Sequence, residues 1–220
     1  MNRQLRRSVL AGLLPIVMFC ASGCGVANLL VYPFAPREAK KFVEREHDLT
    51  AERLLILTYA GNDVLFEYPT AGLEISYQVI QHMSNHLKGR VHRVINPNRV
   101  ARYQQRTLDW PNMPVDEIGR VFEADKVLYV ELSRFTIMEE RSANLYRGRV
   151  IARLQVYDTA APEGDALLYT GDVSVQVPDD RPMGAMEISE LKLRQATVYR
   201  FAEEVVWKFF DHEEKVVTGR

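Results

Sequence analysis

The segment Leu145–Asp158 alternates strictly between two kinds of side chain. Small or apolar residues occupy every second position from Gly148 to Val156, and arginines occupy several of the positions between them. A period of two residues is typical of a β-strand that turns one face to a core and the other face away from it. This long, two-faced strand therefore predicts a sheet whose second side is left open.

The rest of the chain supplies the other elements of such a sheet. The run Leu54-Leu55-Ile56-Leu57 is apolar at every position, as in a strand covered on both faces. The expected order is β-α-β-α-α-β-β-β-α, which predicts an α/β fold with a single mixed β-sheet and helices mainly on one face. The expected strands are 53–59, 91–95, 127–135, 145–158 and 169–177, and the expected helices are 71–88, 96–106, 115–123 and 187–212.

Two of the expected helices carry apolar residues at spacings of three and four, which predicts the face that each helix buries. In the helix 71–88 the stripe is Leu73, Ser76, Ile80, Met83 and Leu87. In the closing helix 187–212 it is Leu193, Ala196, Tyr199, Ala202, Val206 and Phe209.

The amino terminus has the layout of an export signal. Arg3, Arg6 and Arg7 form a short basic region, and an apolar run over Val9–Phe19 follows it. This run is shorter than the roughly 20 residues that a membrane-spanning helix needs, so it predicts a signal peptide over residues 1–23. Alternatives are an ordinary cleaved signal, a retained anchor, or a twin-arginine export signal at the paired arginines.

Directly after the apolar run stands Ala21-Ser22-Gly23-Cys24. It resembles the lipobox of bacterial lipoproteins, although Ala21 replaces the usual leucine. The resemblance implies lipidation (palmitate) of Cys24, a tether over residues 24–50 and an α/β domain over residues 51–220. Within the tether, the segment 36–47 is expected to form a short polar helix that serves as a solvated arm. Gly25 in place of aspartate favours the outer membrane over the inner, with the domain facing the periplasm.

Composition narrows the classes of protein further. The chain is 47% hydrophobic and 26% charged, which is typical of a globular domain. Its formal net charge is −1, and loss of residues 1–23, with three arginines and no acid, makes it −4, which argues against a nucleic-acid partner. Cys20 would leave with the signal, so no thiol would remain for a disulfide, a metal site or a nucleophile.

Three segments carry a family resemblance: Ile118–Val130, Val150–Thr159 and Leu168–Gly171. They resemble the TolB amino-terminal domain and the curli-secretion-type envelope lipoproteins, in which Ala-Asp precedes a hydrophobic strand and a later strand ends in an Asp-Thr-Gly turn. This chain inserts residues 160–163 before Gly164 and has Tyr169 where tryptophan is usual. The resemblance implies a non-enzymatic role in envelope assembly, secretion or scaffolding, and it supplies no functional residues.

The outward side of the strand 145–158 is the first candidate site. Arginine and tyrosine are enriched at protein interfaces, so this face predicts a contact with a protein partner or with a second copy. The alternative is a solvated face whose arginines pair with Glu131 and Asp172. The candidate interface residues are Tyr129, Arg147, Arg149, Ile151, Arg153 and Tyr157.

The loop after the first buried strand is the second candidate. Gly61, Asn62 and Asp63 follow the carboxyl end of that strand, where open α/β sheets bind ligands. The alternative is that these residues simply form a turn. His82 and His86 are four residues apart, a spacing that can hold zinc, but no further ligand lies nearby, so we expect no metal and no cofactor.

No phosphate-binding, nucleophile-elbow or metalloprotease motif occurs in the sequence. We therefore expect no enzyme, but a membrane-anchored, periplasm-facing lipoprotein that acts as a binding, scaffolding or envelope-assembly module. The alternative is a small-molecule-binding or hydrolytic protein that uses the loop after the first strand. A pocket lined by acids or histidines at that loop would favour the alternative.

Overall fold

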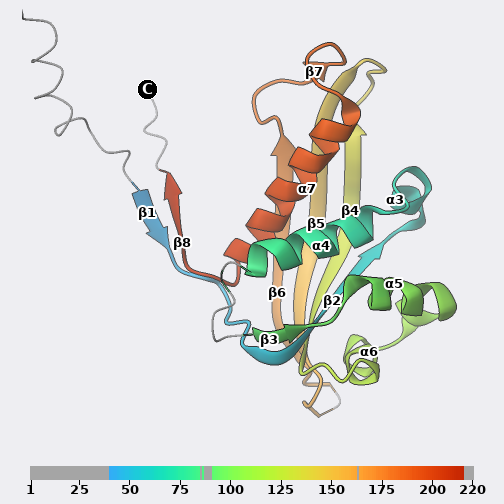
Figure 1. The fold of residues 1–220 in the computed structure, drawn as a ribbon, viewed down its shortest axis with the longest axis vertical. Coiled ribbons are helices and arrows are strands. Elements are labelled where there is room, and N and C mark those ends of the chain that lie inside the picture. The colour runs from blue at the N-terminus through green and yellow to red at the C-terminus, as the bar shows by residue number, and fades with distance from the viewer. Residues whose placement is uncertain (1–39, 85, 87–90, 163, 216–220) are drawn as a thin grey trace, which may run out of the picture. The chain divides into compact units, whose positions relative to one another are not determined.

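The computed structural model describes residues 40–84, 86, 91–162 and 164–215 (Figure 1). The signal peptide, Cys24 and most of the tether lie outside these residues. Two units are present, a main unit over residues 43–212 and a small one that includes residues 40–42 and 213–215.

A two-stranded sheet joins β1 (Lys40–Val43) to β8 (His212–Lys215), and Lys40 Nζ lies 2.7 Å from Glu213 Oε2. The helix expected over residues 36–47 is therefore wrong for the described part, because few of its residues could be buried, whereas strand pairing satisfies the backbone. The closing helix also ends earlier than expected, at Trp207, so that His212 begins a strand.

The main sheet has the order β3-β2-β4-β5-β6, and a short β7 pairs with β5. β2 is parallel to β3 and β4, whereas β4, β5 and β6 are antiparallel to one another. The predicted α/β fold with one mixed sheet is thus confirmed. The strands are β2 (Ala51–Ala60), β3 (Val91–Val94), β4 (Lys126–Met138), β5 (Leu145–Asp158), β6 (Leu167–Val177) and β7 (Met183–Gly184).

The two longest helices, α4 (Ala71–Ser84) and α7 (Glu190–Trp207), lie on one face of the sheet and enclose the main core (Figure 1). Two shorter helices, α5 (Pro97–Arg106) and α6 (Val115–Val121), cover the other face near β2 and β4 and enclose a smaller core around Ile118. In the described residues, no helix covers this second face along most of β5 and β6 (Figure 1). The prediction of an open side therefore holds for this half of the sheet.

The predicted stripes of the two long helices are confirmed in part, since the structure buries Ser76, Met83, Leu193, Ala202, Val206 and Phe209. In α4 the fully buried residues include Ile75 and Val79, whereas the predicted Leu73 is only half-buried. In α7 Phe201 is fully buried, whereas the predicted Tyr199 is 54% exposed. On each helix, two neighbouring sets of residues have the spacing of three and four that a buried face requires. The set that buries more apolar area faces the sheet.

The loop expected between the first strand and the first helix contains a short helix, α3 (Asn62–Glu67). Gly61 precedes this helix as its N-cap, and Val64 is its only buried residue. A helix of six residues with one buried side chain is too short to show a helical period in the sequence. A 3-10 turn (Trp110–Asn112) similarly lies between α5 and α6.

Candidate functional site

The outward side of β5 carries a compact charged cluster. The alternation turns Val150 and Ala152 into the main core and turns Arg147 and Arg149 to the opposite side. Glu139, just beyond the end of β4, lies between the two guanidinium groups. Its carboxylate is 2.8 Å from Arg149 Nη2 and 3.2 Å from Arg147 Nε.

This cluster is held in place more firmly than an ordinary surface ion pair. The side chains of Arg147, Arg149 and Glu139 are only 15%, 17% and 16% exposed. The Arg149 hydrogen bond and the two nearby positive charges hold the pKa of the Glu139 carboxyl below its usual range. Nη1 of Arg149 is buried and has no hydrogen-bond partner among the described residues. Arg147 Nε and Glu139 Oε2 are also buried without a hydrogen-bond partner among the described residues, so the contact between these two atoms is an ion pair without a hydrogen bond.

Farther along β5, the same side is exposed. Ile151 is 37% exposed, and the side chains of Arg153 and Asp172 are 58% and 74% exposed. Arg153 Nε lies 3.5 Å from Asp172 Oδ1 across the β5–β6 pair. We call the set Arg147, Arg149, Ile151 and Arg153 the open face. The sequence left open that the arginines pair with Glu131 and Asp172. Arg153 does pair with Asp172, whereas Arg147 and Arg149 pair with Glu139.

The two candidate tyrosines lie away from the open face. Tyr129 and Tyr157 are partly buried against the smaller core, next to α6. Burial raises the pKa of both phenols. The structure thus divides the six predicted interface residues into an arginine-rich group on the open face and a tyrosine pair that packs against a helix.

A hollow of about 570 Å³ lies between α3 and the end of β4. Asp63 and Glu139 both line it, so the predicted ligand loop and the arginine cluster meet at one depression. Phe66, which also lines the hollow, is 90% exposed. Sequence reasoning missed Phe66 and Glu139, because the expected strand ended at residue 135 and the helix α3 was not expected.

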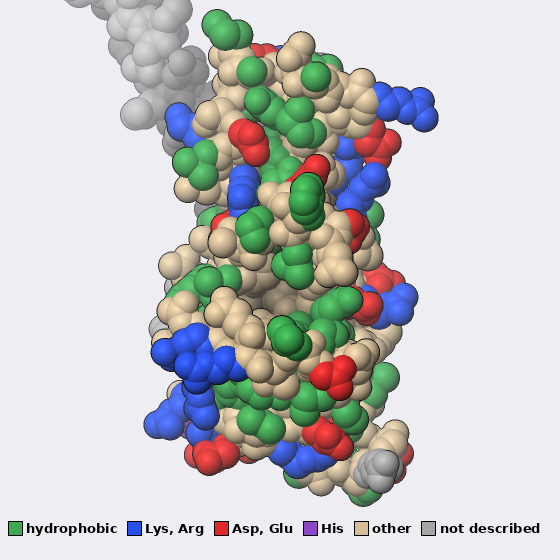
Figure 2. All heavy atoms as spheres, turned by 90° about the vertical axis from the view of Figure 1, so that its right-hand side faces the viewer, with side chains coloured by type: hydrophobic (Ala, Val, Ile, Leu, Met, Phe, Trp, Pro, Cys, Tyr) green, Lys and Arg blue, Asp and Glu red, His purple; other side chains and the backbone are tan. Residues whose placement is uncertain are grey.

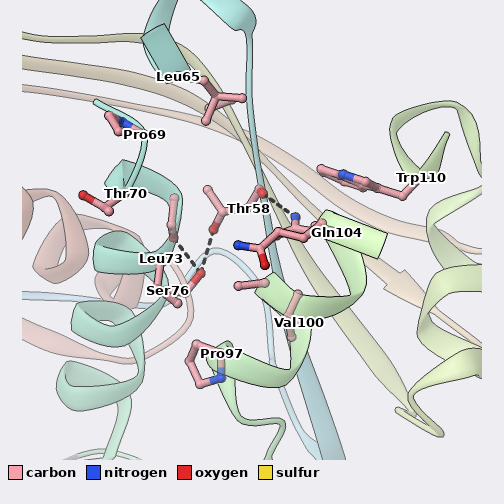
Figure 3. Close-up of a pocket in the computed structure, with 14 residues that line it drawn as sticks. Thr58, Leu65, Pro69, Thr70, Leu73, Ser76, Pro97, Val100, Gln104 and Trp110 are labelled. Carbon is pink, nitrogen blue, oxygen red and sulfur yellow. Dashed lines mark hydrogen bonds between the residues drawn. The ribbon is translucent and has the colours of Figure 1, made fainter. Parts of the chain in front are cut away.

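A second cavity, of about 320 Å³, opens at the carboxyl end of β2, between α4 and α5 (Figure 3). A hollow is also visible near the middle of Figure 2, with hydrophobic side chains around it. Gly61, Asn62 and Asp63 do not line this cavity, although they lie next to it in the chain. Its walls are formed by Thr58, Ala60, Leu65, Pro69, Thr70, Gly72, Leu73, Ser76, Pro97, Val100, Ala101, Gln104, Gln105 and Trp110.

The two candidate metal-binding histidines contact aromatic rings. His82 meets Tyr199 edge-on at 4.4 Å between ring centroids, and His86 lies 5.5 Å from Phe210. Burial lowers the pKa of His82. The described part of the chain contains no group of three or more side chains placed to hold a metal ion. Nor does it contain a helix long and apolar enough to cross a membrane.

The chain matches no protein-family model and no curated protein. Among solved structures, the PelC dodecamer from Paraburkholderia phytofirmans has 10% identity and a TM-score of 0.43, covering 78% of this chain and 98% of that chain. Lipoprotein GNA1162 from Neisseria meningitidis has 13% identity and a TM-score of 0.41, covering 70% and 97%. The hypothetical protein CT253 from Chlamydia trachomatis has 12% identity and a TM-score of 0.38, covering 70% and 92%.

A bacterial lipoprotein is therefore among the solved structures to which this chain is similar. Similarities at this low sequence identity and TM-score support no conclusion about function or assembly. The resemblance to the TolB and curli-secretion-type lipoproteins stays a prediction from the sequence.

Proposed function

We propose that this protein is a membrane-anchored, periplasm-facing lipoprotein whose α/β domain acts as a non-enzymatic binding module in the cell envelope. The anchor is a lipid on Cys24, supported by the basic, apolar and small-residue segments that precede this cysteine. The binding surface is the open face of β5. The observation that carries the proposal is a pair of arginines, Arg147 and Arg149, held by Glu139 on a side of the sheet that no described helix covers there.

The open face suits a protein partner because its arginines are already ordered. Immobilising a long side chain on binding costs roughly 0.5–1.5 kcal/mol, and the contacts with Glu139 already restrict the side chains of Arg147 and Arg149. Ile151 supplies an apolar centre, and the exposed Arg153 can exchange Asp172 for a carboxylate on the partner. The fitting partner therefore presents carboxylates around an apolar side chain.

The hydrolytic alternative has less support. General acid–base catalysis needs a titratable group within hydrogen-bond reach of the substrate. The hollow at the predicted ligand loop is lined by four acids, Asp63, Glu67, Glu139 and Glu140, which is the lining that this alternative requires, but Glu139 and Glu140 are already paired with Arg149 and Arg134. The cavity at the carboxyl end of β2 is lined by no acid, histidine, lysine or arginine. Its uncharged lining suits the binding of a ligand better than acid–base chemistry.

The test is crosslinking at a defined position in intact membranes. A photoreactive amino acid replaces Ile151 in one variant and Leu191 in the other. Leu191 is a matched control, since it is 64% exposed and lies on α7, which packs against the opposite face of the sheet. We expect a discrete crosslinked protein from position 151 and none from position 191. Equal products at both positions, or none at position 151, would contradict the proposal.

A further inference from the structure

The cavity at the carboxyl end of β2 lies between two helical connections that run on opposite faces of the sheet. The chain leaves β2 and reaches β3 through α4 on one face, and it leaves β3 through α5 on the other face. A crevice results at the carboxyl end of the strands, the place where open α/β sheets bind ligands. The pairing of β2 with β3 stops at Leu54↔Val94, whereas β2 continues to Ala60. The cavity therefore borders an edge of β2 that β3 does not occupy.

Hydrogen-bond acceptors in the wall lie at Thr58 and Gln104 (Figure 3). The Ser76 hydroxyl donates to the Gly72 carbonyl at 2.9 Å, so the Thr58 hydroxyl is the donor in its 3.0 Å contact with Ser76. Thr58 Oγ1 consequently keeps its lone pairs. The Thr58 carbonyl accepts only one hydrogen bond from a side chain, from Gln104 Nε2 at 3.0 Å, and the carboxamide oxygen of Gln104 has no described partner. A ligand that donates a hydrogen bond would find acceptors here, and the second Nε2 hydrogen of Gln104 and the indole N–H of Trp110 offer donors beside them.

The remaining wall is apolar and carries no charge. Its apolar lining residues include Leu65, Leu73, Val100 and Trp110, and none of the lining residues is ionisable. A charged ligand would lose its hydration without gaining a counter-charge, which is costly. An uncharged ligand with an apolar body avoids this cost.

We infer that this cavity binds a small, uncharged, amphipathic molecule that carries a hydroxyl or amide N–H donor on an apolar body. Its volume, about 320 Å³, lies at the lower end of the range of roughly 300–1,000 Å³ found for small-molecule sites. The donor faces Thr58 and Gln104, and the apolar body lies against Leu73 and Trp110. This site is separate from the open face, so the inference does not depend on the proposed function.

The experiment uses three probes of the same shape: benzyl alcohol, benzoate and benzylammonium. Each is titrated into the ¹⁵N-labelled mature domain, and the indole N–H of Trp110 and the side-chain amide of Gln104 are followed by NMR. The indole of Trp207 is an internal control, since it stacks on His212 and does not line the cavity. We expect saturable shifts at Trp110 and Gln104 with benzyl alcohol, at least tenfold weaker binding of both charged probes, and no shift at Trp207.

A filled variant completes the test. Ala101, half-buried on α5, lines the cavity, and Ala101→Leu should weaken benzyl alcohol binding at least tenfold. Ala196→Leu, on an exposed position of α7, is the matched control and should bind as the wild type does. Equal binding of the three probes would overturn the inference, and so would unchanged binding in Ala101→Leu or the absence of saturable shifts at Trp110.

Discussion

At the scale of single residues, Glu139 determines how the open face is arranged. The alternation in β5 predicted the outward direction of Arg147 and Arg149 correctly. The acid that holds them could not be predicted, because it lies beyond the hydrophobic part of β4 and comes near them only through the β4–β5 hairpin. Register across a hairpin depends on bulges, and this pair has two irregularities in its register.

The depressed pKa of Glu139 predicts how stability responds to acid. A carboxyl whose pKa is lower in the folded state stabilises the fold above its unfolded value of about 4.3, and this contribution is lost as the pH falls through the folded pKa. Glu139→Gln should therefore lower the urea midpoint at pH 7 and flatten its decline below about pH 4.5. Glu140→Gln is the matched control, since Glu140 pairs with Arg134 at the exposed surface. Urea unfolding between pH 2 and 7 gives the comparison, and identical profiles for the two variants would contradict the account.

At the scale of elements, the strands were easier to predict than the buried sides of the helices. A period of two fixes which residues share a face, so β5 has the bounds that its alternation predicted. In α7 the residues on two adjacent stripes have similar apolar content, and only packing against β5 and β6 selects one. Thr197 illustrates this selection, because this polar residue is fully buried with its hydroxyl bonded to the Leu193 carbonyl at 2.8 Å.

The selected face of α7 has a measurable consequence. Phe201→Ala should lower the free energy of unfolding by about 3–5 kcal/mol, because it empties a fully buried site. Tyr199→Ala should cost about 1 kcal/mol or less, since Tyr199 is 54% exposed and mainly contacts His82. Denaturant unfolding of the two purified variants measures both values. Equal losses would show that α7 is rotated relative to the structure.

At the scale of the whole molecule, the order of elements predicted the mixed sheet because each strand and helix has a distinct period. The order did not predict that α5 and α6 would cover part of the second face, nor the strand pair β1–β8. That pair joins residues about 170 positions apart, and such contacts leave no local pattern. The cavity between α4 and α5 follows from the same topology, since its walls come from five separate elements, β2, α3, α4, α5 and the 3-10 turn.

The proposed anchor is also a property of the whole molecule. Cys24→Ser should move the protein from the membrane fraction to the soluble fraction or leave it unprocessed, because each buried lipid methylene contributes about 0.8 kcal/mol to anchoring. Fractionation and the mass of the mature chain distinguish these outcomes from the wild type. An unchanged mass and unchanged fractionation would show that Cys24 carries no lipid.

The central claim is that the domain binds its partner through the open face, and a double variant tests it most directly. Ile151→Lys combined with Arg153→Glu changes two exposed positions and leaves Arg149 and its Glu139 partner intact. Leu191→Lys, on the exposed side of α7, is the matched control. The measurement is the yield of the protein–protein adduct after chemical crosslinking in membranes, with the unfolding midpoint of each variant beside it. We predict an unchanged midpoint and loss of the adduct in the double variant alone, whereas a folded double variant that forms the adduct at the wild-type yield would contradict the claim.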